Sequence, residues 1–268
     1  MAAEPIVPDP RLRNLDNPAI VGFVYLLSML VLGFGETAIP AKYGEPGFVT
    51  AYLRYEILVA CLFVAATFMW FPARRIGLGA PRMRSKKLAM PMFLWFGLAV
   101  AAYAITWFAR LPGSPHDFGL SARMLATTSL VGFAEEWMYR GLLFAFLSRV
   151  LGLRAGGYLA LLAFGVLHLL NMIGGVPPAG AAMQFGITAC IGSVLLLGAL
   201  GTGSLWVGML LHALYDFIVF DMMTIKTAGL RPGFDWVGLL PLVGGLVLGV
   251  YALTLVGKLK GVEPYPEE

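Results

Sequence analysis

Eight long apolar runs follow one another along this chain of 268 residues. A helix needs about 20 mostly apolar residues to cross the hydrocarbon core of a bilayer. The runs therefore predict an all-α fold, a polytopic membrane bundle with about eight transmembrane helices. The expected helices cover residues 18–36, 52–71, 89–108, 122–147, 156–173, 181–200, 203–222 and 236–257.

The composition supports a membrane protein over a soluble one. Hydrophobic residues make up 59% of the chain and charged residues 13%, against about 45–50% and about 25% in ordinary soluble domains. The connections between the runs are short, which predicts a single transmembrane domain over residues 18–257 with tails at 1–17 and 258–268. The two cysteines, Cys61 and Cys190, lie within apolar runs and do not indicate a disulfide framework.

The basic residues predict the orientation of the helices. Cytoplasmic loops of membrane proteins carry an excess of Lys and Arg, and the segment 72–88 holds six such residues and no acidic one. With eight spans, a cytoplasmic 72–88 loop places both termini in the cytoplasm of a cell-membrane protein. The net charge of +4 is thereby explained by a lipid partner, and no nucleic acid partner is expected.

Charged side chains interrupt the fourth apolar run at Glu135, Glu136 and Arg140. A charge at the bilayer centre costs at least about 2.5–3.5 kcal/mol, so it usually has a partner and a purpose. Glu136 and Arg140 are four residues apart and share one helix face, whereas Glu135 is rotated by about 100° from Glu136. This pattern suits either a general base beside a supporting ion pair or a buried ion network that fixes helix packing.

Two further apolar runs carry histidines. His168 lies in the fifth, while His212 and Asp216 are four residues apart in the seventh, on one helix face. Asp216 is expected to accept a hydrogen bond from the His212 ring and to set its orientation. Each group is also compatible with internal hydrogen bonding alone. Their similar depth predicts one internal site, suited to activating water or to binding a divalent metal such as zinc.

Taken in order, these motifs resemble the CAAX protease and bacteriocin-processing family, the Abi or CPBP group, which is related to the Rce1-type prenyl protease of eukaryotes. The resemblance implies an intramembrane endopeptidase of the glutamate-dependent type, acting on a membrane-anchored peptide or protein such as a prenylated CAAX substrate. The residues that carry it are Glu135-Glu136-x-x-x-Arg140, Phe164-x-x-x-His168 and His212-x-x-x-Asp216.

The resemblance also implies roles for the residues. Glu135 would be the general base that activates water, and His168 would help to polarise that water. Glu136 and Arg140 would be the supporting pair. His212 and Asp216 would stabilise the oxyanion or orient the water. The eukaryotic enzyme has Asn in place of Asp216, and an ionised Asp only accepts hydrogen bonds. No metal or other cofactor is implied as a requirement.

Two other classes of function compete with the peptidase. One is a non-catalytic membrane scaffold or bacteriocin-immunity protein of the same fold. The other is a proton-coupled transporter, because buried Glu, His and Asp side chains also mark ion paths. Transporters of this kind often contain repeated halves, and the sequence contains no convincing repeat.

Overall fold

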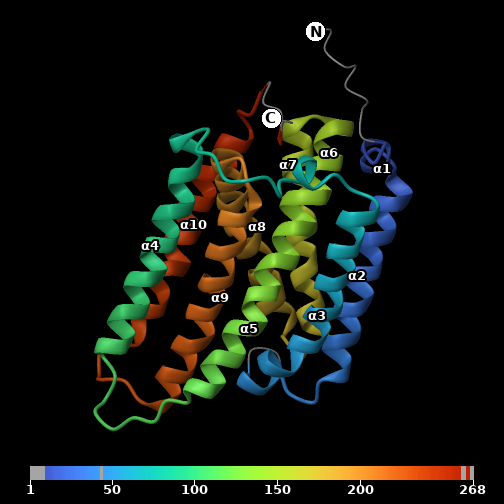
Figure 1. Ribbon diagram of the computed structural model, residues 1–268. Coiled ribbons are helices and arrows are strands. Elements are labelled where there is room, and N and C mark those ends of the chain that lie inside the picture. Colours follow the sequence, from blue (N-terminus) through green and yellow to red (C-terminus); the bar gives the residue numbers. More distant parts are fainter. Residues whose placement is uncertain (1–9, 43–44, 261–263, 266–268) are drawn as a thin grey trace.

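A computed structural model describes residues 10–42, 45–260 and 264–265 of the chain. These residues form a bundle of helices (Figure 1), and their one β-type pairing is an isolated bridge between Arg110 and Leu230. The helices are α1 (Leu12–Leu15), α2 (Pro18–Ala38), α3 (Pro46–Met69), η1 (Ala73–Ile76), α4 (Lys86–Phe108), α5 (Phe118–Glu135), η2 (Glu136–Leu143), α6 (Phe144–Leu151), α7 (Leu153–Leu167), η3 (His168–Met172), α8 (Pro178–Thr202), α9 (Leu205–Ala228), η4 (Asp235–Gly238) and α10 (Leu239–Val256).

Seven helices in the described part of the chain are long and apolar enough to cross a membrane. They are α2, α3, α4, α7 with η3, α8, α9, and η4 with α10. The remaining expected span, residues 122–147, corresponds to α5, η2 and α6, which continue one another from Phe118 to Leu151 and cross the height of the bundle in Figure 1. The prediction of a polytopic all-α membrane bundle is thereby confirmed.

The helix ends follow local sequence signals. Pro46 starts α3 six residues before the expected position, because proline suits the first turn of a helix. The tight hairpin between α8 and α9 turns on Gly203, whose φ of +65° is the left-handed conformation that glycine tolerates best. The Ser204 side chain then caps α9 by accepting a hydrogen bond from the Trp206 backbone N–H.

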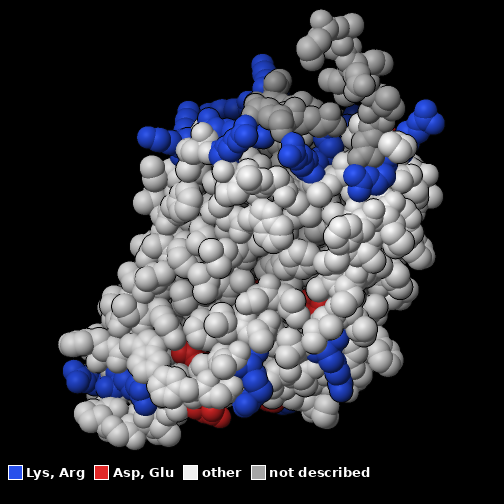
Figure 2. Space-filling view, in the orientation of Figure 1, with Lys and Arg blue, Asp and Glu red and all other residues white. Residues whose placement is uncertain are grey.

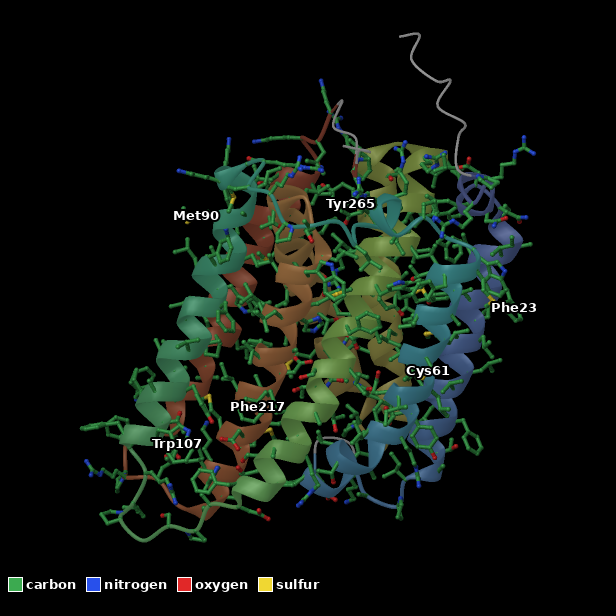
Figure 3. All side chains as sticks on the ribbon, viewed as in Figure 1. Phe23, Cys61, Met90, Trp107, Phe217 and Tyr265 are labelled. Atoms are coloured by element: carbon green, nitrogen blue, oxygen red, sulfur yellow. The ribbon has the colours of Figure 1, made fainter. Side chains whose placement is uncertain are left out.

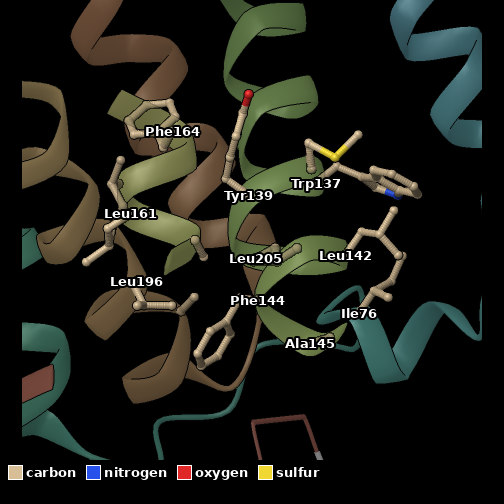
Figure 4. Packing of buried hydrophobic residues seen from close by; sticks show 14 of the residues in the cluster. Ile76, Trp137, Tyr139, Leu142, Phe144, Ala145, Leu161, Phe164, Leu196 and Leu205 are labelled. Atoms are coloured by element: carbon tan, nitrogen blue, oxygen red, sulfur yellow. The ribbon is translucent and has the colours of Figure 1, made fainter. Parts of the chain in front are cut away.

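Helix α8 lies at the centre of the bundle, since 67% of its most apolar stretch is buried inside the protein. Large hydrophobic side chains fill the space between α8 and its neighbours, and Figure 4 shows Leu196 of α8 near Leu161 of α7 and Phe144 of α6. Other large apolar side chains lie on the outside of the bundle, including Phe23 and Met90, labelled in Figure 3. An apolar exterior of this kind suits contact with lipid.

Basic side chains gather at one end of the bundle, shown at the top of Figure 2. The 73–87 segment, α1 and the end of α10 all lie at this end in Figure 1. Parts of both predicted tails pack here: Leu15 is 1% exposed and Tyr265 is 2% exposed. Residues 1–9, 261–263 and 266–268 of those tails lie outside the described residues.

Candidate active site

The charged residues of the fourth apolar run, Glu135, Glu136 and Arg140, lie where an α-helix becomes a π-helix. Helix α5 ends at Glu135, and η2 from Glu136 to Leu143 is π-helical before α6 resumes the regular geometry. Short π-helical turns inside α-helices occur frequently at functional sites. Gly132, one turn earlier, lets α5 lie directly against α9, because a Cβ atom there would be 2.7 Å from the Ala213 backbone nitrogen. The two glutamates are therefore held beside the histidine of α9.

Glu136 binds two positive or donor groups through one oxygen. Its Oε1 atom lies 3.1 Å from Nη1 of Arg140 and 2.9 Å from Nδ1 of His212. Glu136 and Arg140 are 0% and 1% exposed. The Arg140 guanidinium also lies 3.8 Å from the centre of the Phe164 ring, a favourable cation–π geometry. The i,i+4 ion pair expected from the sequence is confirmed.

The second ring nitrogen of His212 lies near two more carboxylates. Its Nε2 atom is 3.6 Å from Oε2 of Glu135 and 3.6 Å from Oδ2 of Asp216. The role of Asp216 in orienting the ring stays a prediction, and the shorter contact to the ring, 2.9 Å at Nδ1, is with Glu136 on the opposite side. The sequence could not indicate this contact, since Glu136 and His212 lie on different helices.

His168 is fixed in a different way. Its Nδ1 atom lies 3.0 Å from the Phe164 carbonyl oxygen, which can only accept, so Nδ1 carries the proton of this hydrogen bond. In the neutral ring, Nε2 is then an acceptor. The Phe164 ring packs edge-on against His168 and His212, with centroid separations of 4.9 Å and 6.3 Å. Phe164 thus contacts both imidazoles.

Four of the six predicted residues line one cavity of about 370 Å³. Glu135, His168, His212 and Asp216 form part of its wall, whereas Glu136 and Arg140 lie behind this wall. The rest of the lining comes from α2, α3, α5, α7, η3, α8 and α9 and is largely apolar. A mainly apolar cavity with a few convergent polar groups is the usual form of a binding site in a protein.

The part of the chain that forms this site resembles a known protein family. Residues 117–218 match the family model described as "Type II CAAX prenyl endopeptidase Rce1-like". We refer to residues 117–218 as the Rce1-like segment. No curated protein and no solved structure matches the chain. The Rce1-like segment runs from the residue before α5 into α9, so it contains all three motifs, and the resemblance drawn from them is confirmed.

Two cavity residues outside the Rce1-like segment were missed by the sequence interpretation. Glu36 of α2 and Glu56 of α3 are 6% and 3% exposed, and both line the cavity. Each is an acidic residue within an apolar run, which is by itself a reason to suspect function in a membrane helix. The signal was therefore present, but neither residue belongs to a recognised motif.

The Rce1-like segment brings carboxylates and imidazoles together without forming a typical metal site. Among residues 10–42, 45–260 and 264–265, no group of three or more His, Cys, Asp or Glu side chains has the geometry to hold a metal ion. His212 is the imidazole nearest the carboxylates, and one of its two ring nitrogens is occupied by the hydrogen bond to Glu136. No step is therefore assigned to a metal.

A second polar cluster joins the start of the Rce1-like segment to α4 and the far half of α9. Asp221 is fully buried and accepts hydrogen bonds from Ser121 Oγ at 2.5 Å and from the Tyr103 hydroxyl at 2.6 Å. His116 Nε2 lies 3.1 Å from the same Ser121 Oγ. Because Ser121 donates to Asp221, this cluster differs from a catalytic serine activated by histidine. It ties three helices together near one end of the bundle.

Proposed function

We propose that this protein is an intramembrane endopeptidase that hydrolyses a peptide bond with water activated by Glu135. One observation carries the proposal: Glu136 pairs with Arg140 and with Nδ1 of His212, so Glu135 faces the cavity without sharing that ion pair. A carboxylate with this freedom, beside an oriented imidazole, has the arrangement that a general base requires.

The proposed reaction begins with a water molecule between Glu135 and the substrate carbonyl. Glu135 takes a proton from the water, and the water oxygen forms a bond to the carbonyl carbon. The carbonyl π electrons move to the oxygen, which gives a tetrahedral oxyanion. The C–N bond then breaks, and the proton held by Glu135 passes to the leaving nitrogen. His168 Nε2 accepts a hydrogen bond from the water and so directs its lone pair at the carbonyl.

His212 is the proposed donor to the oxyanion. Both of its ring nitrogens face carboxylate oxygens, and both can donate only when the ring carries two protons. Nδ1–H is held by Glu136, which leaves Nε2–H for the developing negative charge. A fixed donor aimed at the developing charge is among the largest contributions to catalysis, worth about 10²–10³ in rate for one donor.

The substrate proposed for this site is a membrane-anchored peptide or protein, including prenylated CAAX proteins. Apart from α5, the helices around the cavity are apolar enough to span a bilayer. This supports a cavity at membrane depth, where the substrate would be anchored in lipid. We place the protein in the cell membrane with both termini in the cytoplasm, on the side of the basic 72–88 segment.

The test compares the wild-type protein with Glu135→Gln in detergent. The substrates are a farnesylated CAAX peptide and a library of membrane-anchored peptides, with products identified by mass spectrometry. General-base catalysis contributes about 10²–10⁴ in rate, so we expect Glu135→Gln to lose at least 100-fold. Glu45→Gln, the same change at an exposed residue before α3, is the matched control.

Other outcomes would replace the proposal. Intact peptides after incubation with the wild-type protein would overturn it. Tight peptide binding without hydrolysis would then favour a non-catalytic scaffold or immunity protein, and substrate-dependent proton flux in liposomes would favour a transporter.

A further inference from the structure

Two carboxylates in the cavity have no role in the proposed reaction. Glu36 lies two residues before the end of α2 and Glu56 lies ten residues into α3. Both line the same cavity as Glu135, and both are more than nine-tenths buried. The Oε2 atom of each has no hydrogen-bond partner among the residues that the structure describes. A buried polar atom left in this state carries a free-energy cost that a bound ligand would remove.

The charges on the cavity wall are unbalanced. Glu36, Glu56, Glu135 and Asp216 all line it, and the basic side chains in the described lining are two imidazoles, His168 and His212, with no lysine or arginine. Arg140 is held behind the wall by Glu136. The four carboxyl groups share one cavity, so their ionised forms repel one another. A ligand with a positive charge would relieve this repulsion, whereas a ligand carboxylate would increase it.

Two aromatic residues of α3 precede Glu56 in the sequence. Phe48 and Tyr52 both line the cavity, and their rings stack with centroids 5.3 Å apart. Aromatic faces attract ammonium and guanidinium groups, and an aromatic ring can also pack against the alkyl stem of a lysine or arginine side chain. Carboxylates and aromatic rings together are therefore suited to a long basic side chain.

This part of the cavity is at the end of the bundle opposite the basic 73–87 segment. Helix α2 ends here and α3 begins here (Figure 1). Ten residues of helix span about 15 Å, so Glu56 lies well inside while Glu36 lies close to the end of the bundle. Met223, which is 49% exposed, also lines the cavity, so the cavity reaches the molecular surface.

We infer that Glu36 and Glu56, with Phe48 and Tyr52, form a subsite for a lysine or arginine side chain of the substrate, away from the scissile bond. The inference rests on the proposed function, since it assigns the substrate's charge. It also disfavours a substrate whose free C-terminal carboxylate must enter this part of the cavity.

The test uses peptides that share one sequence and one membrane anchor and differ at a single position. That position carries Lys, Gln or Glu, and is moved in turn to each residue within six of the cleaved bond. For wild-type protein we expect kcat/KM with Lys to exceed that with Gln by about 10-fold or more at one position, with Glu lowest. Glu56→Gln and Glu36→Gln should each bring the Lys/Gln ratio towards one, whereas Glu45→Gln should keep the wild-type ratio.

Binding separates failure of the subsite from failure of the proposed reaction. The same peptides, labelled with a fluorophore, are titrated into Glu135→Gln protein and followed by anisotropy. Tighter binding of the Lys peptide supports the subsite even where no peptide is cleaved by wild-type protein, a result that would overturn the reaction alone. Equal binding of Lys, Gln and Glu peptides at every position would overturn the subsite. This comparison needs no change at Glu36 or Glu56, so a misfolded variant cannot obscure the result.

Discussion

The Nδ1 atom of His212 lies 2.9 Å from Oε1 of Glu136, and the same oxygen lies 3.1 Å from Nη1 of Arg140. A single carboxylate oxygen thus joins the π-helical segment to α9. This contact sets which nitrogen of His212 faces the cavity, and it neutralises a guanidinium that is 1% exposed. Glu136 is therefore a positioning residue that acts through His212.

Glu136→Ala is expected to damage both stability and activity. Removing one partner of a buried ion pair costs about 3–5 kcal/mol, because the other charge stays buried and unpaired. Thermal unfolding in detergent should show a clear loss of Tm, together with loss of hydrolysis. The double change Glu136→Leu with Arg140→Leu removes both charges and should recover much of the Tm but not the hydrolysis, because the His212 ring is then unanchored. An unchanged Tm for Glu136→Ala would contradict this account of the ion pair.

Gly132→Ala should separate α5 from α9. The added methyl group would lie 2.7 Å from the Ala213 nitrogen and 2.8 Å from the Met209 carbonyl oxygen, and backbone atoms cannot move aside cheaply. Overpacking of this kind costs about 1–3 kcal/mol, and the resulting shift should move Glu135 away from His212. Gly97→Ala is the matched control, since a Cβ atom there meets nothing within 4 Å. Equal Tm and equal kcat/KM for the two variants would show that the close approach is unimportant.

The ion pair between Asp16 and Arg149 gives a prediction about pH. Hydrogen bonds from Arg149 hold the pKa of Asp16 below its usual value of 3.8. A lowered folded-state pKa stabilises the fold above the unfolded pKa, and this stability is lost as pH falls through the folded pKa. Both side chains are partly exposed, so the contribution is only about 0–1 kcal/mol. Arg149→Ala should lower Tm slightly at pH 7, and the difference should begin to shrink near pH 3.8 and vanish below the lowered folded-state pKa of Asp16.

Arg13→Ala is the matched change for this pH test, on the exposed side of α1. Its effect on Tm should not follow the titration of Asp16. A difference between wild type and Arg149→Ala that stayed constant from pH 7 to pH 3 would contradict the role given to the pair.

The proposed orientation is tested by labelling single cysteines. The background carries Cys61→Ser and Cys190→Ser, and the two positions compared are Lys86→Cys at the basic end and Pro112→Cys in the connection between α4 and α5. In intact cells, a membrane-impermeant maleimide should label Pro112→Cys and spare Lys86→Cys, with the reverse in inverted vesicles. The opposite pattern would reverse the proposed orientation.

Hydropathy predicted most of the fold, because a membrane helix must satisfy its own backbone hydrogen bonds and so leaves a long apolar run in the sequence. The motifs predicted which helices meet, since Glu135, His168, His212 and Asp216 line one cavity. Contacts within one helix, such as Glu136 with Arg140, could be read from spacing alone.

Contacts between helices were harder to predict. The bond from Glu136 to His212 depends on the rotation of α5 against α9, which Gly132 makes possible and which spacing within either helix does not encode. Glu36 and Glu56 were missed for a different reason. Each is a single acidic residue in a helix with no second polar partner at i+4, so nothing indicated that both face the active-site cavity.

The π-helical turn from Glu136 to Leu143 makes the length of this segment a constraint in its own right. Each residue in an α-helix advances the helix by about 100°, and the wider π-helical turn rotates less per residue. Converting this segment to a regular helix of the same length would therefore rotate α6 against α5. Glu135 could then keep its place at the cavity, or Arg149 could keep its bond to Asp16, but one rigid helix could not satisfy both. Substitutions that keep the wide turn should therefore be tolerated better than those that straighten it.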